Sequence, residues 1–159
     1  MRYLFSITLA LLASGSTASA TAAASVDVVV SADAPPLEQL AAQELAGQFR
    51  RLFAAQVTVG AKPAGAAPVR VLIGSPQTNP AVRAAIGDRW PQLSDQGLVI
   101  RSLELAGANG AEVAGLVVGG GSPVATLWAV YELGHRRGVR YLSRGDIFPD
   151  VSQTVDLTG

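Results

Sequence analysis

The stretch Leu116–Gly138, LVVGGGSPVATLWAVYELGHRRG, joins an apolar β-branched segment to a helical pattern through three consecutive glycines. Ser122 is a favourable N-cap and Pro123 a favourable first helical residue, so the pattern predicts a helix from Ser122 to about Arg137. Glycine allows a tight turn and lets a helix approach a sheet closely. The stretch therefore predicts a corner between a strand and a helix.

Three glycines after a strand also raise the question of a phosphate-binding loop. A Walker-type loop needs a lysine and then Ser or Thr after its last glycine, and the dinucleotide loop needs G-x-G-x-x-G. The only lysine of the chain is Lys62, and Val124 stands where the dinucleotide pattern requires glycine. The sequence therefore favours the structural corner over a nucleotide site.

The rest of the chain alternates between strand and helix patterns. Apolar or alternating segments predict strands at 26–32, 56–60, 69–74, 97–105, 113–118 and 139–142. A short helix is predicted from Asn79, as its N-cap, to about Ile86. Asn109-Gly110 is a hairpin-turn signal between two strands. Hairpins mixed with helical crossovers predict an α+β fold, a single domain in which two long helices pack on a mixed sheet.

The first long helix is expected to begin after Asp33, with Pro35-Pro36 in its first turn, and to end near Phe53. Its apolar residues recur at helical spacing and predict one buried stripe, formed from Leu37 by Leu40, Ala41, Leu45, Phe49, Leu52 and Phe53. The polar residues are expected largely on the solvent side: Glu38, Gln39, Gln43, Gln48, Arg50 and Arg51.

The N-terminal residues have the pattern of a Sec-type signal peptide. Arg2 precedes the apolar segment 3–13, and Ala18-Ser19-Ala20 is an A-x-A cleavage site. We expect residues 1–20 to be removed, with alternative cleavage positions up to about residue 24, and the protein to be secreted or periplasmic with no membrane association after cleavage. Residues 25–150 are then the folded domain and 151–159 a C-terminal tail.

The composition offers few candidates for a nucleic-acid, metal or catalytic site. The formal net charge is zero without a basic stripe, which disfavours nucleic acid as a partner. There is no cysteine, and the single His135, expected on or near the packed stripe of its helix, has no partner at metal-ligand spacing. Glu132 and Arg136 predict a surface ion pair. We expect no metal, no cofactor and no catalytic pair, because the candidate carboxylates lie on different segments: Asp95, Glu104, Glu112, Asp146 and Asp150.

The C-terminal third resembles the N-terminal accessory domain of certain glycoside hydrolases, most closely that of α-glucuronidases and also the domain that precedes the barrel in β-hexosaminidases. The motifs are DQGLVIRS (95–102), the stretch 116–142 and RGDIFPD (144–150). The matching positions are Gly119–Gly121, Tyr131-Glu132-Leu133, Gly138-Val139-Arg140, Tyr141 and Pro149. Residues 31–57 and 71–82 are more loosely similar to the first helix and the following strand and loop. His135 departs from the family's acidic or polar preference, and its role stays open.

This resemblance implies a β-hexosaminidase domain-2-like fold and a non-catalytic role beside a catalytic (β/α)₈ barrel, in cis or in trans. Such a barrel takes about 250 residues, and ten residues follow Pro149. We therefore expect none of the family's catalytic residues on this chain. The expected function is that of an accessory domain of an exported, α-glucuronidase-like hydrolase of polysaccharides. The expected barrel interface consists of Trp128, Arg140, Tyr141 and Phe148.

Two alternatives remain open. The chain could be a stand-alone exported carbohydrate-binding module with an oligosaccharide as its ligand. Sugar sites use exposed aromatic platforms, and Trp90, before Pro91 in an expected loop, is the candidate. A tryptophan that closes the edge of the core explains the same residue. The other alternative, a small exported enzyme of unknown type, has no supporting motif.

Overall fold

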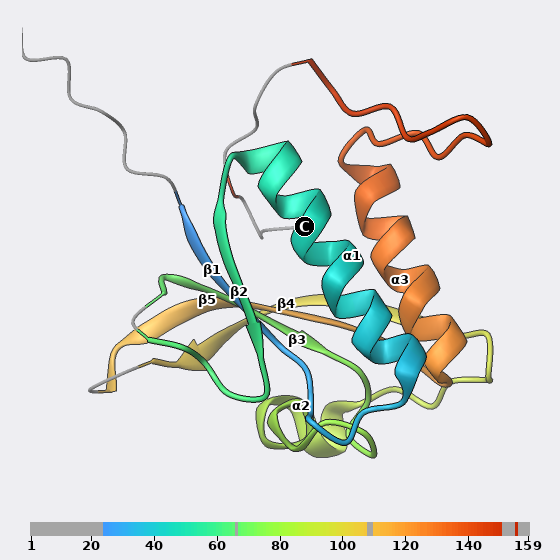
Figure 1. Cartoon of the computed structure of the whole chain (residues 1–159). Helices are drawn as coiled ribbons and strands as arrows, with labels where there is room; N and C mark the ends of the chain where they lie inside the picture. The colour runs from blue at the N-terminus through green and yellow to red at the C-terminus, as the bar shows by residue number, and fades with distance from the viewer. Residues whose placement is uncertain (1–23, 66, 108–109, 151–154, 156–159) are drawn as a thin grey trace, which may run out of the picture.

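The computed structural model describes residues 24–65, 67–107, 110–150 and Val155, which form one α+β domain with a mixed five-stranded sheet (Figure 1). The predicted signal peptide, Asn109 of the predicted turn and all of the expected tail except Val155 lie outside these residues. No helix in the described part of the chain has the length and apolarity to cross a membrane. The elements are β1 Ser25–Val29, α1 Pro36–Phe53, β2 Gln56–Gly60, β3 Val69–Ile73, α2 Pro80–Ile86, a 3₁₀ turn Gly87–Arg89, β4 Leu98–Ala106, β5 Glu112–Gly120 and α3 Pro123–Arg136.

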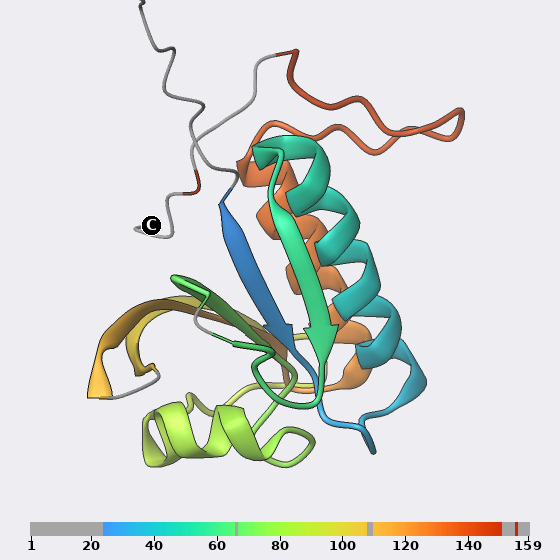
Figure 2. The same ribbon diagram turned by 60° about the vertical axis from the view of Figure 1, so that its left-hand side comes forward.

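The strands lie in the order β2-β1-β3-β5-β4. The first four strands in this order are parallel to one another, and β4 pairs antiparallel with β5 in register from Leu98–Gly120 to Ala106–Glu112. The predicted mixed sheet and the predicted hairpin are therefore confirmed. Figure 2 shows the strong twist of the sheet, which turns the β4–β5 hairpin away from β1 and β2.

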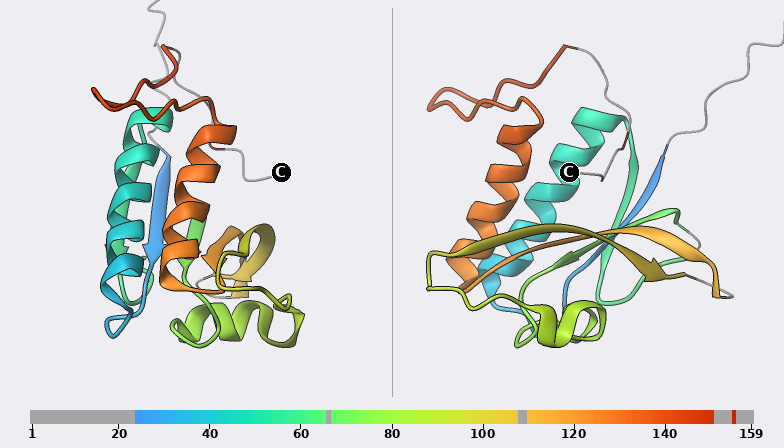
Figure 3. Two further views of the ribbon diagram at one scale, coloured as in Figure 1. Left: turned by 90° about the vertical axis from the view of Figure 1, so that its right-hand side faces the viewer. Right: turned by 180° about the vertical axis from the view of Figure 1, so that it is seen from behind.

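Helices cover both faces of the sheet. The helices α1 and α3 run side by side in the same direction on one face, and α2 lies on the other (Figures 1 and 3). Because side chains alternate along a strand, each face has its own core. The core under α1 and α3 includes Val26, Val28, Val71 and Val118. The smaller core under α2 is formed by Val29, Leu72, Val82, Ile86, Leu105 and Val117.

The three glycines form the predicted corner between β5 and α3. None of them adopts a left-handed φ, so close packing rather than turn geometry requires glycine here. A Cβ at Gly119 would lie 2.1 Å from the carbonyl oxygen of Gly74, and a Cβ at Gly120 would lie 2.5 Å from the Cβ of Ala125. Ser122 caps α3, because its hydroxyl accepts a hydrogen bond from the amide of Ala125.

The predicted solvent side of α1 is partly wrong. Glu38 and Gln48 are only 1% and 3% exposed, whereas Leu37 and Leu40 are 37% and 43% exposed. The reason is that α1 packs against α3 as well as against the sheet, so its buried surface is wider than one apolar stripe and is turned toward α3. Thr126 of α3 accordingly donates a hydrogen bond of 3.4 Å to the carboxyl of Glu38.

The last predicted strand, 139–142, is also wrong. Arg140 and Ile147 form an isolated antiparallel bridge through two backbone hydrogen bonds of 2.9 Å, so this segment pairs with itself and not with the sheet. Residues 139–150, here called the strap, lie over the C-terminal ends of α1 and α3 (Figure 3).

Candidate functional site

Large apolar side chains are strongly exposed at the first two turns of α1 and α3. These are Leu37, Leu40, Val124 and Trp128, with exposed fractions between 37% and 46%, and we call them the outer helix face. The only other large apolar side chains of the described residues with comparable exposure are Leu142 and Ile147 of the strap. The large exposed apolar side chains of the described residues are therefore confined to the helical layer and its strap, and such side chains mark interaction sites where they form a patch.

The strap is held on the helices by two aromatic contacts. The rings of Tyr141 and Tyr131 meet edge to face, with centroids 4.9 Å apart. The guanidinium of Arg51 lies 3.7 Å from the centroid of the Phe148 ring, a cation–π contact. The hydroxyl of Tyr141 is buried without a hydrogen-bond partner. Burial, with a smaller contribution from the charge of Asp146, raises the pKa of Tyr141 to about 12.

The structure does not bring the four expected interface residues together. Trp128 lies in the second turn of α3, whereas Arg140, Tyr141 and Phe148 belong to the strap over the other end of that helix. Trp128 and Arg140 are exposed, but Tyr141 and Phe148 are half-buried in contacts within the domain. The outer helix face, whose four residues all lie in the first two turns of α1 and α3, is the other candidate interface, and of these residues only Trp128 was predicted from the sequence.

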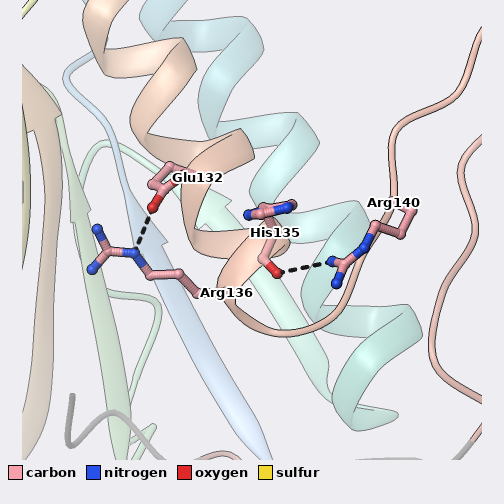
Figure 4. A network of polar contacts seen from close by, with 4 residues as sticks. All are labelled: Glu132, His135, Arg136 and Arg140. Carbon is pink, nitrogen blue, oxygen red and sulfur yellow. Dashed lines mark hydrogen bonds and ion pairs between the residues drawn. The ribbon is translucent and has the colours of Figure 1, made fainter.

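The end of α3 holds polar residues that face solvent (Figure 4). Glu132 and Arg136 form the predicted ion pair at 2.7 Å. His135 is exposed, so its expected position on or near the packed stripe is wrong. Its backbone carbonyl accepts a hydrogen bond of 3.3 Å from Arg140. No group of three or more potential metal ligands occurs within the described ranges.

A polar cleft of about 600 Å³ lies at the carboxyl ends of β3 and β5. Trp90 is half-buried in its wall, and its ring packs 2.9 Å from where a Cβ of Gly119 would lie. The tryptophan thus closes the α2-side core and also faces the cleft. The remaining wall residues are Pro76, Gln77, Gly87, Asp88, Pro91, Gln92, Leu93, Gly120 and Gly121. Ligands of open α/β sheets bind at this end of the strands.

Glu38 is a buried carboxyl that sequence analysis placed in solvent. One carboxylate oxygen accepts hydrogen bonds from Thr78 at 3.1 Å and from Thr126 at 3.4 Å, and the other oxygen has no partner. Burial raises the pKa of Glu38, and the two hydroxyl hydrogen bonds offset part of this effect. A second carboxylate is not hydrogen-bonded to it in the described structure, and the candidate acids from the sequence are all exposed: Asp95, Glu104, Glu112, Asp146 and Asp150.

Asn79 links two strands beside this carboxyl. Its amide nitrogen donates hydrogen bonds to the carbonyls of Val29 and Ile73, at 3.1 and 2.8 Å, and its amide oxygen accepts from Ala81. The predicted N-cap is confirmed. The same side chain therefore fixes the carboxyl ends of β1 and β3 to each other.

The comparisons with known proteins find likeness among solved structures. No family model and no curated protein matches the chain. Among solved structures, a family GH115 4-O-methyl-α-glucuronidase with specificity for decorated arabinogalactans is similar over 71% of this chain, with a TM-score of 0.43 and 15% sequence identity. The matched region is 13% of that glucuronidase, so this chain spans a small part of its length.

Proposed function

We propose that this chain is a non-catalytic accessory domain of an exported, α-glucuronidase-like glycoside hydrolase and that it docks on a catalytic barrel. The observation that carries the proposal is the outer helix face: Leu37, Leu40, Val124 and Trp128 are exposed on the first two turns of two helices that run side by side. The motif resemblance in residues 95–150 supports a barrel as the partner. The barrel belongs either to the same polypeptide or to a second one.

The chemistry of the outer helix face suits a protein partner. Burying a Leu or Val side chain contributes about 1.5–3 kcal/mol relative to leaving it exposed. Tryptophan is enriched among the residues that dominate binding energy at interfaces. Trp128 is the largest side chain of this face and is 46% exposed. We therefore assign it the central position in the interface.

The docking test uses an α-glucuronidase barrel that lacks its own N-terminal domain. Calorimetric titration with this chain should show binding, and Trp128→Ala should weaken it by about 2 kcal/mol or more. His135→Ala, an exposed position at the other end of the same helix, serves as the control and should bind like the wild type. Equal binding by the Trp128 variant and the wild type would remove the outer helix face as the interface.

A separate assay tests the absence of catalysis. The purified chain should not hydrolyse aryl glucuronide or aryl N-acetylglucosaminide substrates. Turnover that co-purifies with the chain would overturn the accessory-domain proposal, and it would leave the docking result to be explained in another way.

The alternative is a stand-alone exported carbohydrate-binding module, and the Trp90 cleft is the observation that favours it. Its wall offers an aromatic ring beside the amides of Gln77 and Gln92, the mixture that sugar sites use. Trp90→Ala should abolish binding to immobilised oligosaccharides. Because this ring also packs on Gly119, Gln92→Ala is the second variant: Gln92 is exposed, and its loss should weaken binding without unfolding the domain. Unchanged sugar binding by both variants would reject the cleft.

A further inference from the structure

An apolar cavity of about 310 Å³ lies on the α2 side of the sheet and shares no lining residue with the outer helix face or the Trp90 cleft. Its wall is formed by one turn of α2, the sheet residues beneath it and one loop proline. Arg70 is the only charged residue in this wall. The other wall residues are Val29, Pro63, Leu72, Ala81, Ala84, Ala85, Leu105 and Ala106.

Arg70 reaches this cavity because of its position on β3. Its neighbours Val69 and Val71 belong to the core under α1 and α3, so Arg70 faces the α2 side. Its Nη1 donates a hydrogen bond of 2.9 Å to the carbonyl of Ala106, which orients the guanidinium across to β4. Its Nε is buried and has no hydrogen-bond partner.

No described acidic residue forms an ion pair with Arg70. Asp27 is its register partner on β1 and faces the same side of the sheet, but the two side chains are not within ion-pair distance. The charge of Arg70 is therefore not neutralised by direct contact with a carboxylate, and a half-buried guanidinium with a buried, unpaired Nε beside an apolar cavity favours an anionic partner.

We propose that this cavity binds a small amphipathic carboxylate, with its aliphatic body between α2 and the sheet and its carboxylate against Arg70. The volume is at the lower end of the 300–1,000 Å³ of small-molecule sites, which limits the ligand to a short chain. A cationic amphiphile is disfavoured by Arg70, and a neutral alcohol lacks the ionic contact. This inference does not depend on the proposed function.

The first experiment is a calorimetric titration of the whole protein with saturated carboxylates from butanoate to octanoate. Affinity should rise about fourfold for each added methylene until the cavity is filled. Octanoate should bind at least tenfold more tightly than octanol, and octyltrimethylammonium should bind most weakly of the three. Octanol binding as tightly as octanoate would overturn the role of Arg70, and no binding of any carboxylate would overturn the proposal.

Variants locate the site. Arg70→Gln should weaken octanoate binding about tenfold or more while changing octanol binding less than threefold. Ala85→Leu should abolish binding of both ligands, because it fills the cavity from a helix that accepts leucine. Gln43→Leu adds the same side chain at an exposed position of α1 and should leave both affinities unchanged. Wild-type affinity in the Ala85 variant, or amide shifts at the outer helix face instead of α2 when octanoate is titrated into ¹⁵N-labelled protein, would overturn the proposed site.

Discussion

The close-packed corner between β5 and α3 makes a quantitative prediction for Gly119→Ala. The new Cβ would lie 2.1 Å from the carbonyl oxygen of Gly74, about 1.3 Å short of the distance at which ordinary contact begins, and 2.9 Å from the ring of Trp90. The first obstacle is backbone at the buried end of β3, so no rotamer change relieves it. Overpacking of this kind costs about 1–3 kcal/mol, and the rigid neighbour puts this site at the upper end.

A matched glycine provides the control. Gly47 lies inside α1, and a Cβ there would meet nothing within 4 Å. Gly47→Ala should therefore stabilise the protein by about 0.5–1 kcal/mol, the gain expected for alanine over glycine within a helix. The two variants carry the same chemical change with opposite expected signs.

Urea unfolding, followed by far-UV circular dichroism, measures both variants. Their midpoints should move in opposite directions at an unchanged m-value, with a difference of about 3–4 kcal/mol between them. If Gly119→Ala were as stable as the wild type, the glycines would not be a packing requirement. The explanation of the corner by close approach would then fail, and a role for this loop in ligand binding would have to be reopened.

Three further substitutions test the buried polar groups. The raised pKa of Glu38 means that the native state binds this proton more tightly than the unfolded state, so its contribution to stability falls as pH rises from the ordinary 4.5 through the folded pKa. Glu38→Gln should remove this dependence of the unfolding free energy on pH, and the variant should be more stable than the wild type at neutral pH. If the pH dependence of unfolding were unchanged in the variant, the raised pKa of Glu38 would be refuted. Tyr141→Phe should be neutral or stabilising by about 1 kcal/mol in thermal unfolding, because the buried hydroxyl has no partner, and a clear loss of stability would show that it has one. Asn79→Ala should cost about 2–4 kcal/mol in urea unfolding, because it removes a cap and leaves the carbonyls of Val29 and Ile73 unpaired; a loss below 1 kcal/mol would refute this linking role.

The parts of the fold that the sequence predicts well are those with local causes. Ser122-Pro123 and Asn79 start helices where their side chains and ring geometry require, and the alternating segments around residues 97–120 form the expected hairpin. These signals depend on neighbours in the chain. Because these signals are local, they predict the mixed sheet and the two long helices but not the order of the strands.

The errors share a different cause, because they concern which element lies beside which. Glu38 and Gln48 are buried because α3 packs on that side of α1 and, for Glu38, because the loop after β3 also covers it; His135, expected on or near the packed stripe of α3, is exposed. The segment 139–142 resembles a strand, but its only pairing is the bridge between Arg140 and Ile147, and the segment lies on the helices instead of joining the sheet. Helical or strand periodicity alone does not contain this information.

One feature of the sequence could have indicated that Arg70 lies at a binding site. It interrupts the apolar strand VRVLI, just as Asp27 interrupts SVDVV, and the two positions become register partners in the sheet. A charged residue at an inward-facing strand position is costly unless something compensates it. Two such positions on adjacent strands are therefore a reason to look for a site on that face, although only the packed sheet shows that they are adjacent.

The sheet separates the outer helix face from the carboxylate cavity, and this makes these two surfaces independent. The outer helix face belongs to α1 and α3, and the carboxylate cavity belongs to α2 and the opposite face of the sheet. Mutations at distant sites without shared partners act additively. Trp128→Ala should therefore leave octanoate affinity unchanged, and Arg70→Gln should leave docking to the barrel unchanged. If either variant impaired both activities, the two surfaces would have to communicate through the sheet, and the assignment of one ligand to each face would be wrong.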